Sequence, residues 1–507
     1  MHPPSPHPVP VPSVGPGAAS TTIELLREAM ADADFTHDVV SSRLDVPSIV
    51  AIGTKSLEEL MARTASGTRL DTLIRLFCMN APYTAGTLDA ILGTGLCAAI
   101  RAMGLVRDGP SGERSTVCIN PVRGLWIASD IPRAGETRAS DFVMGIGSST
   151  LTLESLTARR SVGRVLDLGT GCGFHALLAS SHAERVIGTD INERAIAMAR
   201  LNAALNGQPD IEWRIGSFFE PVSGQLFDLI VSNPPFVISP EQDHVYRSAG
   251  MSGDGVTEHV VRGAAGLLAR GGVAQFLCNW AHMRGFDWRD RLATWVEGSE
   301  CDMLVLRSET LDARDYAEYW VGHTREESSE PLAARAARWR ASYEEQGIEA
   351  ASIGMILLHR PIDRDQTWTS FDDAPRKMLG GAGHDVLRRI DAETWLASVR
   401  NEELLDAHLR VASAVRLDHT LRPDERGWAM EQASARLLRG LAYETTIDEA
   451  GARILMRSDG STALRSIVAE IASGLGRPLS EVAPVAVGIV RAMIRRGYLD
   501  RSSEHKV

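Results

Sequence analysis

Residues 165–173 read Val165-Leu166-Asp167-Leu168-Gly169-Thr170-Gly171-Cys172-Gly173. The first part of this run is apolar and strand-like, and the segment from Phe174 to Ser181 that follows has helical character. Glycines at 169, 171 and 173 remove Cβ atoms where a ligand must approach the backbone. The spacing is GxGxG rather than the GxGxxG of dinucleotide binders, so a pyrophosphate is not the expected ligand. The run therefore predicts an α/β fold whose first turn binds another ligand.

Residues at the ends of the next predicted strands extend this site. Asp167 ends the first strand, where its carboxylate suits a cationic methionyl ammonium, directly or through water. Asp190 ends the second strand, at the position from which a carboxylate accepts both ribose hydroxyls. Ser217 and Phe218 follow the third strand, where they can border an adenine. With Asn233-Pro234-Pro235-Phe236 further on, these residues predict S-adenosylmethionine as the cofactor.

The tetrapeptide from Asn233 to Phe236 closes the apolar strand 227–232 and predicts the reaction. An amide or aromatic-amine nitrogen is a poor nucleophile because its lone pair is delocalised. Two acceptors in one plane, the Asn233 side-chain carbonyl and the Pro234 backbone carbonyl, can bind its N–H groups and turn the lone pair outward. Pro235 stiffens the turn after Pro234, and Phe236 supplies a face for a planar group. We therefore expect N-methylation of a planar nitrogen, without an obvious general base.

Each motif also has a simpler interpretation. Asn-Pro-Pro alone can be a tight turn that ends a strand, and a glycine-rich turn alone can serve another ligand or a degenerate site. The two motifs together, with Asp190 in register, favour the methyl-transfer site. Cys172 and His175 are interpreted as packing residues.

Alternating strands and helices over residues 141–360 predict a mostly parallel, Rossmann-like sheet of seven strands. Helices are expected between them, for example at 193–206 and 257–268. The predicted strands are 164–168, 185–190, 211–215, 229–232, 274–278, 303–307 and 355–359.

Two flanking regions and a tail complete the predicted organisation. Residues 1–20 are proline-rich and read as a disordered tail. Residues 21–140 are expected to be helical and winged-helix-like, with helices at 22–31, 68–79 and 87–103, a turn at 108–112 and a strand at 116–119. Residues 361–507 are expected to form a second such region, with helices at 385–400, 401–416 and 485–496, and with residues 459–471 as a turn that opens an amphipathic helix.

Composition narrows the possible partners. The 507 residues contain 53 Lys and Arg against 65 Asp and Glu, a formal net charge of -12, so a generally basic surface for nucleic acid is excluded. The six cysteines form no CxxC pair, which predicts free thiols in a reducing cytosol and no metal site. We expect a cytoplasmic protein, because the chain shows no membrane span and its start is not that of a signal peptide.

The glycine turn, Asp190 and the Asn-Pro-Pro-Phe motif resemble class I S-adenosylmethionine-dependent methyltransferases of the HemK/PrmC-like group, with a small methyltransferase domain. The resemblance covers residues 141–360. It implies that Asp167, Gly169, Gly171 and Asp190 hold the cofactor and that residues 233–236 hold the acceptor nitrogen.

Three acceptors remain open at this point. The segment from Tyr246 to Gly255 resembles the branch that methylates release-factor glutamine, which makes a protein glutamine the first expectation. Phe236 and the winged flanks favour an RNA base, guanine N2 or adenine N6, since the glutamine branch usually carries Tyr at this position. The third expectation is a small molecule or peptide. The sequence predicts no oligomeric state.

Overall fold

The structure, a computed structural model, describes residues 18–84, 86–132, 139–241, 251, 253–324, 330–364, 366–425 and 427–502. Most of the predicted tail, residues 1–17, and most of the segment 246–255 that resembles the glutamine branch lie outside this description. Residues 18–20 do not continue the tail, because they form the first turn of helix α1 (Ala18–Asp32).

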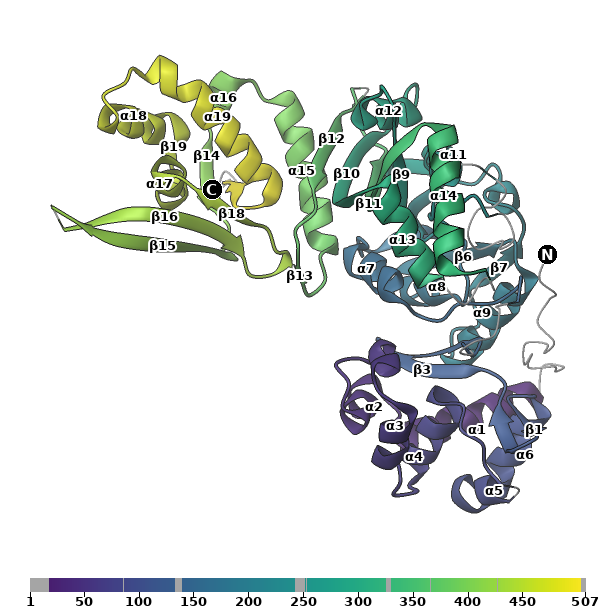
Figure 1. The fold of residues 1–507 in the computed structure, drawn as a ribbon. Coiled ribbons are helices and arrows are strands. Elements are labelled where there is room, and N and C mark those ends of the chain that lie inside the picture. Colours follow the sequence, from purple (N-terminus) through teal and green to yellow (C-terminus); the bar gives the residue numbers. More distant parts are fainter. Residues whose placement is uncertain are drawn as a thin grey trace. The chain divides into compact units, whose positions relative to one another are not determined.

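The N-terminal region is helical up to Ala102 and then forms two hairpins (Figure 1). The predicted helix 87–103 is broken at Gly93, whose φ of +93° separates α5 from α6. The predicted turn at 108–112 joins antiparallel β1 and β2, and the predicted strand at 116–119 begins β3. The elements are α1, α2 (His37–Leu44), η1 (Ile49–Thr54), α3 (Leu57–Arg63), α4 (Arg69–Leu73), η2 (Ile74–Cys78), α5 (Thr87–Leu92), α6 (Thr94–Ala102), β1 (Val106–Gly109), β2 (Gly112–Ser115), β3 (Cys118–Val122) and β4 (Leu125–Ser129).

A central sheet with the strand order β12-β10-β11-β9-β8-β5-β6-β7 follows. All seven predicted strands lie in it, but it has eight strands, because β12 pairs in parallel with β10 from within the predicted C-terminal region. The pairs β5–β6, β5–β8, β6–β7 and β8–β9 are also parallel, so the ends of β5, β6 and β8 meet at one edge. The strands are β5 (Val162–Leu168), β6 (Ala183–Asp190), β7 (Glu212–Ile215), β8 (Phe227–Ser232), β9 (Leu268–Met283), β10 (Asp302–Asp312), β11 (Ile348–His359) and β12 (Thr369–Asp373).

Helices connect these strands, as the alternating pattern requires. The predicted helices at 193–206 and 257–268 correspond to α9 and α11. A helix pair, α13 and α14, lies between β10 and β11 in the chain. The helices are α7 (Ser148–Leu156), α8 (Phe174–Ala179), α9 (Glu193–Leu205), η3 (Glu220–Val222), α11 (Gly255–Ala265), α12 (Trp288–Ala293), η4 (Thr294–Val296), α13 (Ala313–His323) and α14 (Leu332–Gln346).

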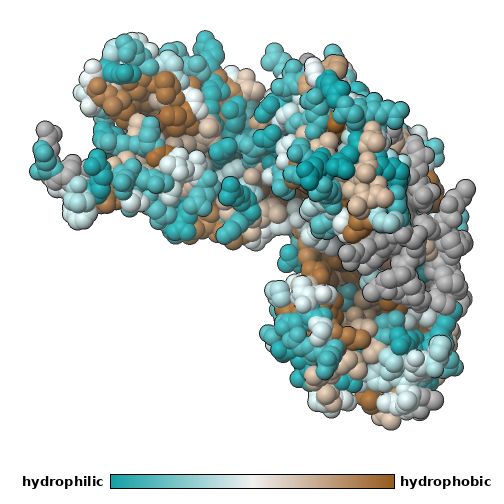
Figure 2. All heavy atoms as spheres, in the orientation of Figure 1, coloured by the Kyte–Doolittle hydropathy of each residue, from teal (hydrophilic) through white to brown (hydrophobic). Residues whose placement is uncertain are grey.

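The C-terminal elements form small sheets and helices. The predicted helix 401–416 is wrong, because the chain ends α16 at Leu405 and then forms strand β14, which pairs with β19 and β20. Exposed Met456, Leu475 and Val485 contribute apolar surface in the region of α17 to α19, where Figure 2 shows an apolar area. The elements are β13 (Met378–Leu379), α15 (Gly383–Ser398), α16 (Asn401–Leu405), β14 (His408–Val411), β15 (Val415–Asp424), β16 (Gly427–Leu437), β17 (Gly440–Leu441), β18 (Glu444–Ile447), α17 (Glu449–Arg457), β19 (Asp459–Ala463), α18 (Leu464–Gly474), α19 (Leu479–Arg496) and β20 (Leu499–Arg501).

Candidate functional site

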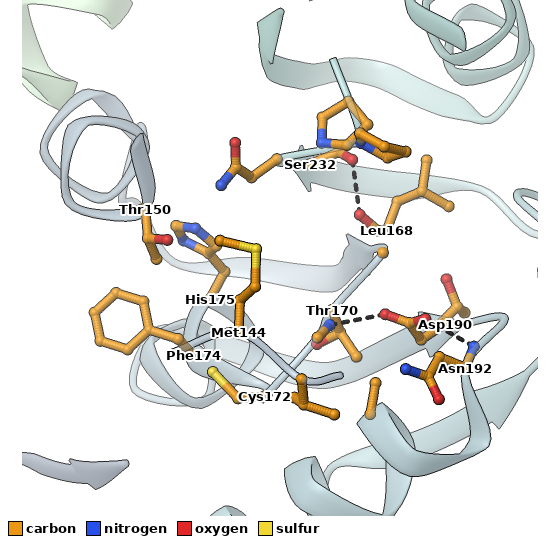
Figure 3. Close-up of a pocket in the computed structure, with 18 of the residues that line it drawn as sticks. Met144, Thr150, Leu168, Thr170, Cys172, Phe174, His175, Asp190, Asn192 and Ser232 are labelled. Atoms are coloured by element: carbon orange, nitrogen blue, oxygen red, sulfur yellow. Dashed lines mark hydrogen bonds between the residues drawn. The ribbon is translucent and has the colours of Figure 1, made fainter. Parts of the chain in front are cut away.

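A cavity of about 400 Å³ opens where β5, β6 and β8 end (Figure 3). Polar groups and glycine backbone from the strand ends face apolar side chains from the segment that precedes α7. Of the residues predicted from sequence, eight line this cavity: Gly169, Gly171, Asp190, Ser217, Phe218, Asn233, Pro234 and Pro235. The structure thus brings both predicted motifs to one place.

The glycine turn forms an open cradle at the cavity wall. Gly169 and Gly171 have φ values of +69° and +53°, which side chains rarely adopt. A Cβ added to either residue would meet no atom within 4 Å, so the space in front of both is free for a ligand. Gly173 differs, because its Cβ would lie 2.9 Å from the Trp213 ring and 3.0 Å from Ala199 Cβ. Gly173 therefore permits close packing and does not line the cavity.

Asp190 is fixed at the end of β6 by two backbone donors. Gly171 N donates to Oδ2 and Asn192 N donates to Oδ1, both at 2.9 Å. Each carboxylate oxygen keeps a second lone pair that a hydroxyl can use. Burial raises the pKa of Asp190, and the backbone hydrogen bonds oppose that rise. Asp190 is therefore oriented before a ligand arrives.

Asp167 is placed behind the glycine turn rather than in the cavity. It is 1% exposed, and its Oδ2 accepts from Thr170 Oγ1 at 2.5 Å and from Ala176 N at 2.9 Å. Burial raises the pKa of Asp167 to about 7, although both hydrogen bonds act in the other direction. In this structure Asp167 holds the turn to the start of α8 and does not reach the cavity.

Asn233 directly follows β8, and among the described residues its side-chain amide has a hydrogen-bond partner at the nitrogen but not at the oxygen. Its Nδ2 donates to Ser149 Oγ on α7 at 3.2 Å. Its Oδ1 is buried and accepts no hydrogen bond from the residues that the structure describes. Just before it, Ser232 Oγ donates to the Leu168 carbonyl oxygen at 2.7 Å, which ties β8 to the glycine turn. A buried unpaired oxygen is costly, and an N–H on a bound molecule would satisfy it.

The aromatic residues predicted for the site lie in different surroundings. Phe218 borders the cavity with a φ of +44°, and its ring lies 4.5 Å from that of His259. Phe236 does not line the cavity. Its ring meets Trp320 edge-on at 5.9 Å and packs against a buried cluster.

Several cavity residues were not predicted as site residues. Residues 142–147, Ser149 and Thr150 close one side, and they come from the segment before β5 and from α7. Cys172 and His175, interpreted as packing residues, also line the cavity, and Figure 3 shows His175 grouped with Thr150 and Met144. The only sequence signal for this wall is the run Gly145-Ile146-Gly147, which lacks a recognised spacing. Burial raises the pKa of the Cys172 thiol to about 12, so it stays protonated.

A buried ion pair holds this wall in place. Arg194 on α9 and Asp130 are each 8% exposed, and Arg194 Nε donates to Asp130 Oδ2 at 2.9 Å. The same carboxylate oxygen accepts from Val143 N at 2.8 Å. Asn192 Nδ2 also donates to the Asp141 carbonyl oxygen at 2.9 Å. Asp130 of the N-terminal region and Asn192 thus hold residues 141–143, of which Phe142 and Val143 line the cavity.

The parallel strand pairs around β5, the glycine cradle and the oriented Asp190 have the arrangement of a class I S-adenosylmethionine-dependent methyltransferase domain. The residues present fit this cofactor. The cradle leaves room at Gly169 and Gly171, and Asp190 retains acceptor sites for a ribose. Within the described residues, no group of three or more His, Cys, Asp and Glu is placed to hold a metal ion. The described helices also include none that is long and apolar enough to cross a membrane.

Residues 143–283 match the family model of the methyltransferase small domain. The chain is 46% identical over 76 residues to a release factor glutamine methyltransferase of Aliivibrio fischeri, which covers 14% of this chain and 27% of that protein. It is 31% identical over 120 residues to a putative protein N5-glutamine methyltransferase of Methanocaldococcus jannaschii, which covers 22% of this chain and 60% of the relative. Each of these matches spans less than two thirds of the relative's own length.

The flanks match other family models, and solved structures align with part of the chain. Residues 32–116 and 388–501 match two models described as domains of unknown function, DUF7059 and DUF7782. Among solved structures, a ribosomal protein L11 methylase of Lactobacillus delbrueckii subsp. bulgaricus aligns with 24% identity and a TM-score of 0.23. That alignment covers 32% of this chain and 71% of the other.

Proposed function

We propose that this protein transfers a methyl group from S-adenosylmethionine to the side-chain amide nitrogen of a protein glutamine. The observation that carries the proposal is Asn233, whose buried Oδ1 lacks a partner among the described residues and which lines one cavity with Asp190 and the glycine cradle. Similarity to proteins named as glutamine methyltransferases supports the choice of acceptor.

The proposed roles follow from where the side chains lie. Asp190 binds the ribose of the cofactor, and the absence of side chains at Gly169 and Gly171 lets the cofactor approach the backbone. Bound S-adenosylmethionine supplies an electrophilic methyl group. Asn233 Oδ1 and the Pro234 carbonyl oxygen accept the two N–H groups of the acceptor amide, which turns the nitrogen lone pair toward the methyl group. Ser149 keeps the Asn233 amide in the orientation that presents its oxygen. The amide proton leaves to water after transfer.

The test is a label-partition assay with a matched control. Wild type, Asn233→Ala and Asn401→Ala are incubated with methyl-labelled S-adenosylmethionine and a bacterial lysate, and protein, RNA and small-molecule fractions are counted separately. Asn401 is exposed at the start of α16 and does not line the cavity. We expect label in protein with wild type and Asn401→Ala, and at least a ~100-fold loss with Asn233→Ala at nearly unchanged cofactor affinity.

Each other outcome has a definite meaning. Asn233-dependent label in RNA or in small molecules would reject the protein acceptor and keep the site. Loss of cofactor affinity in Asn233→Ala would mean that its role is misassigned. Where protein is labelled, mass spectrometry identifies the modified residue, and any residue other than glutamine refutes the proposal.

A further inference from the structure

The turn after β8 is fixed at a second point, beyond the proposed acceptor-binding residues. Ile238 is 1% exposed and lies outside any strand, so its backbone groups need partners from other elements. Its N–H donates to Tyr316 Oη at 3.1 Å, and its carbonyl oxygen accepts from Tyr343 Oη at 2.5 Å. A single buried residue is therefore held on both of its backbone groups.

The two tyrosines come from the helix pair α13–α14, whose members run side by side (Figure 1). Both side chains are 1% exposed. Asn279 on β9, itself fully buried, donates from Nδ2 to Tyr316 Oη at 2.6 Å. Burial raises the pKa of Tyr343 above its ordinary value, so its hydroxyl remains a donor at neutral pH. The two hydroxyls are thus set in place by the core of the domain.

A third anchor follows at Glu241. Arg335 Nε donates to its Oε1 at 2.7 Å, and Trp339 Nε1 donates to the same oxygen at 3.1 Å. Arg335 is 1% exposed and Trp339 is fully buried. Burial alone would raise the pKa of Glu241, but these hydrogen bonds and Arg338 lower it to about 2. Both donors come from α14, so the same helix pair holds the segment from Ile238 to Glu241.

We infer that α13–α14 hold the acceptor-binding turn in its active geometry, with Tyr316 and Tyr343 as positioning residues. This inference rests on the proposed function. Ser232 fixes the start of the turn and Ile238 its end, and two consecutive prolines restrict the backbone between them. The two acceptor carbonyls must share one plane with the reacting nitrogen, and small displacements there cost large factors in rate.

The same helix pair also sets the orientation of Phe236. The Phe236 ring packs against a buried cluster that includes Tyr316, Trp339 and Tyr343, and it contacts Trp320 edge-on. The residue that follows the two prolines is therefore positioned by α13 and α14 as well. Removing either tyrosine hydroxyl should loosen the turn without changing the cradle or Asp190.

The experiment uses the full-length protein with Tyr316→Phe, Tyr343→Phe and the control Tyr319→Phe. Tyr319 lies on the same helix as Tyr316 and is 43% exposed. Hydrogen exchange is followed in the peptide 236–241. The rate of label transfer to the protein fraction of the lysate and the Kd for S-adenosylmethionine are also measured. For Tyr316→Phe and Tyr343→Phe we expect faster exchange, about tenfold slower label transfer and a Kd within about twofold of wild type, and for Tyr319→Phe we expect no change.

The outcomes separate this inference from the proposed function. Unchanged exchange in the peptide 236–241, or unchanged transfer by both variants, would overturn the positioning role. A parallel fall of transfer, cofactor affinity and thermal stability would also overturn it, because that result describes a purely structural role. Full transfer by Asn233→Ala in the same series would instead reject the proposed function, and the exchange measurement, which needs no acceptor, still decides whether the tyrosines hold the turn.

Discussion

Asp167 is a buried carboxyl whose pKa of about 7 lies above its ordinary value of 3.8. The folded protein therefore binds this proton more tightly than the unfolded chain does. Stability from this group is present below pH 4 and is lost as pH rises toward 7, by about 4 kcal/mol at most. We expect Asp167→Asn, which keeps an oxygen for Thr170 and Ala176, to flatten this fall. Denaturant unfolding at pH 5 and pH 8 measures it, and an equal fall in both proteins would contradict the shifted pKa.

Alanine substitutions at Gly169 and Gly224 distinguish the effect of backbone strain from the effect of a side chain that blocks the cofactor. Their φ values are +69° and +75°, and an added Cβ meets nothing within 4 Å at either position. Only Gly169 lines the cavity. Each Gly→Ala change should cost about 1–2 kcal/mol of stability through strain. We expect calorimetry to show at least a ~10-fold weaker Kd for S-adenosylmethionine with Gly169→Ala alone. Equal affinities in the two variants would place the cofactor elsewhere.

Helix α9 connects the N-terminal region to the glycine turn through two asparagines one helical turn apart. Asn202 accepts from Ala128 N at 2.7 Å and donates to Ala128 O at 2.9 Å, while Asn206 makes the same pair of hydrogen bonds with Trp126. Asn202 Nδ2 also donates to the Cys172 carbonyl oxygen at 2.8 Å. Asn206 therefore matches Asn202 in its contacts with β4 and lacks the contact with the turn.

This difference predicts different effects on the cofactor. Asn202→Ala and Asn206→Ala should both destabilise the domain, because each leaves backbone groups of β4 unpaired. Only Asn202→Ala should also weaken S-adenosylmethionine binding, by about tenfold, since it frees the Cys172 carbonyl. Titration calorimetry on both variants checks this. A similar loss of affinity in Asn206→Ala would show that the docking of β4, rather than the contact with the turn, controls the cofactor site.

The elements that the sequence predicts well are those whose pattern is local. The buried strands of the central sheet and the glycine turn can be recognised from apolar runs and spacings within a short stretch of sequence, without knowledge of distant contacts. The helix predicted at 401–416 is correct only from Asn401 to Leu405. Residues 408–411 form strand β14, because they pair with β19 and β20, which lie much further along the chain. The wall at 142–147 has no periodic pattern, and it is ordered by the Asp130–Arg194 pair, which the sequence separates by 64 residues.

The largest departure from the sequence-based picture concerns where the central sheet ends. Strand β12 lies beyond the boundary predicted at residue 360, yet it pairs with Met303–Arg307 of β10. Residues 303–306 of β10 are at most 2% exposed. A protein cut at the predicted boundary would lose this edge strand. The predicted boundary at residue 360 therefore falls before a strand of the central sheet, and the contacts that hold β12 on β10 become important.

Asp302 accepts hydrogen bonds from the connection that leads into β12. It is fully buried, its Oδ1 accepts from Trp368 N at 2.9 Å, and its Oδ2 accepts from His359 Nδ1 at 2.9 Å and from Arg364. These donors flank the connection that leads from β11 into β12. Removing the carboxylate leaves the buried N–H of Trp368 without its partner and deprives the partly buried Arg364 guanidinium of its counter-charge, so we expect Asp302→Ala to cost about 3–5 kcal/mol. Exposed Asp363 in the same connection supplies the control Asp363→Ala, which should cost less than about 0.5 kcal/mol. Denaturant unfolding gives both values, and faster hydrogen exchange at residues 369–373 in Asp302→Ala alone would show that β12 is the part released. Equal stability in the two variants would mean that β12 is held by its ladder with β10 and not by Asp302.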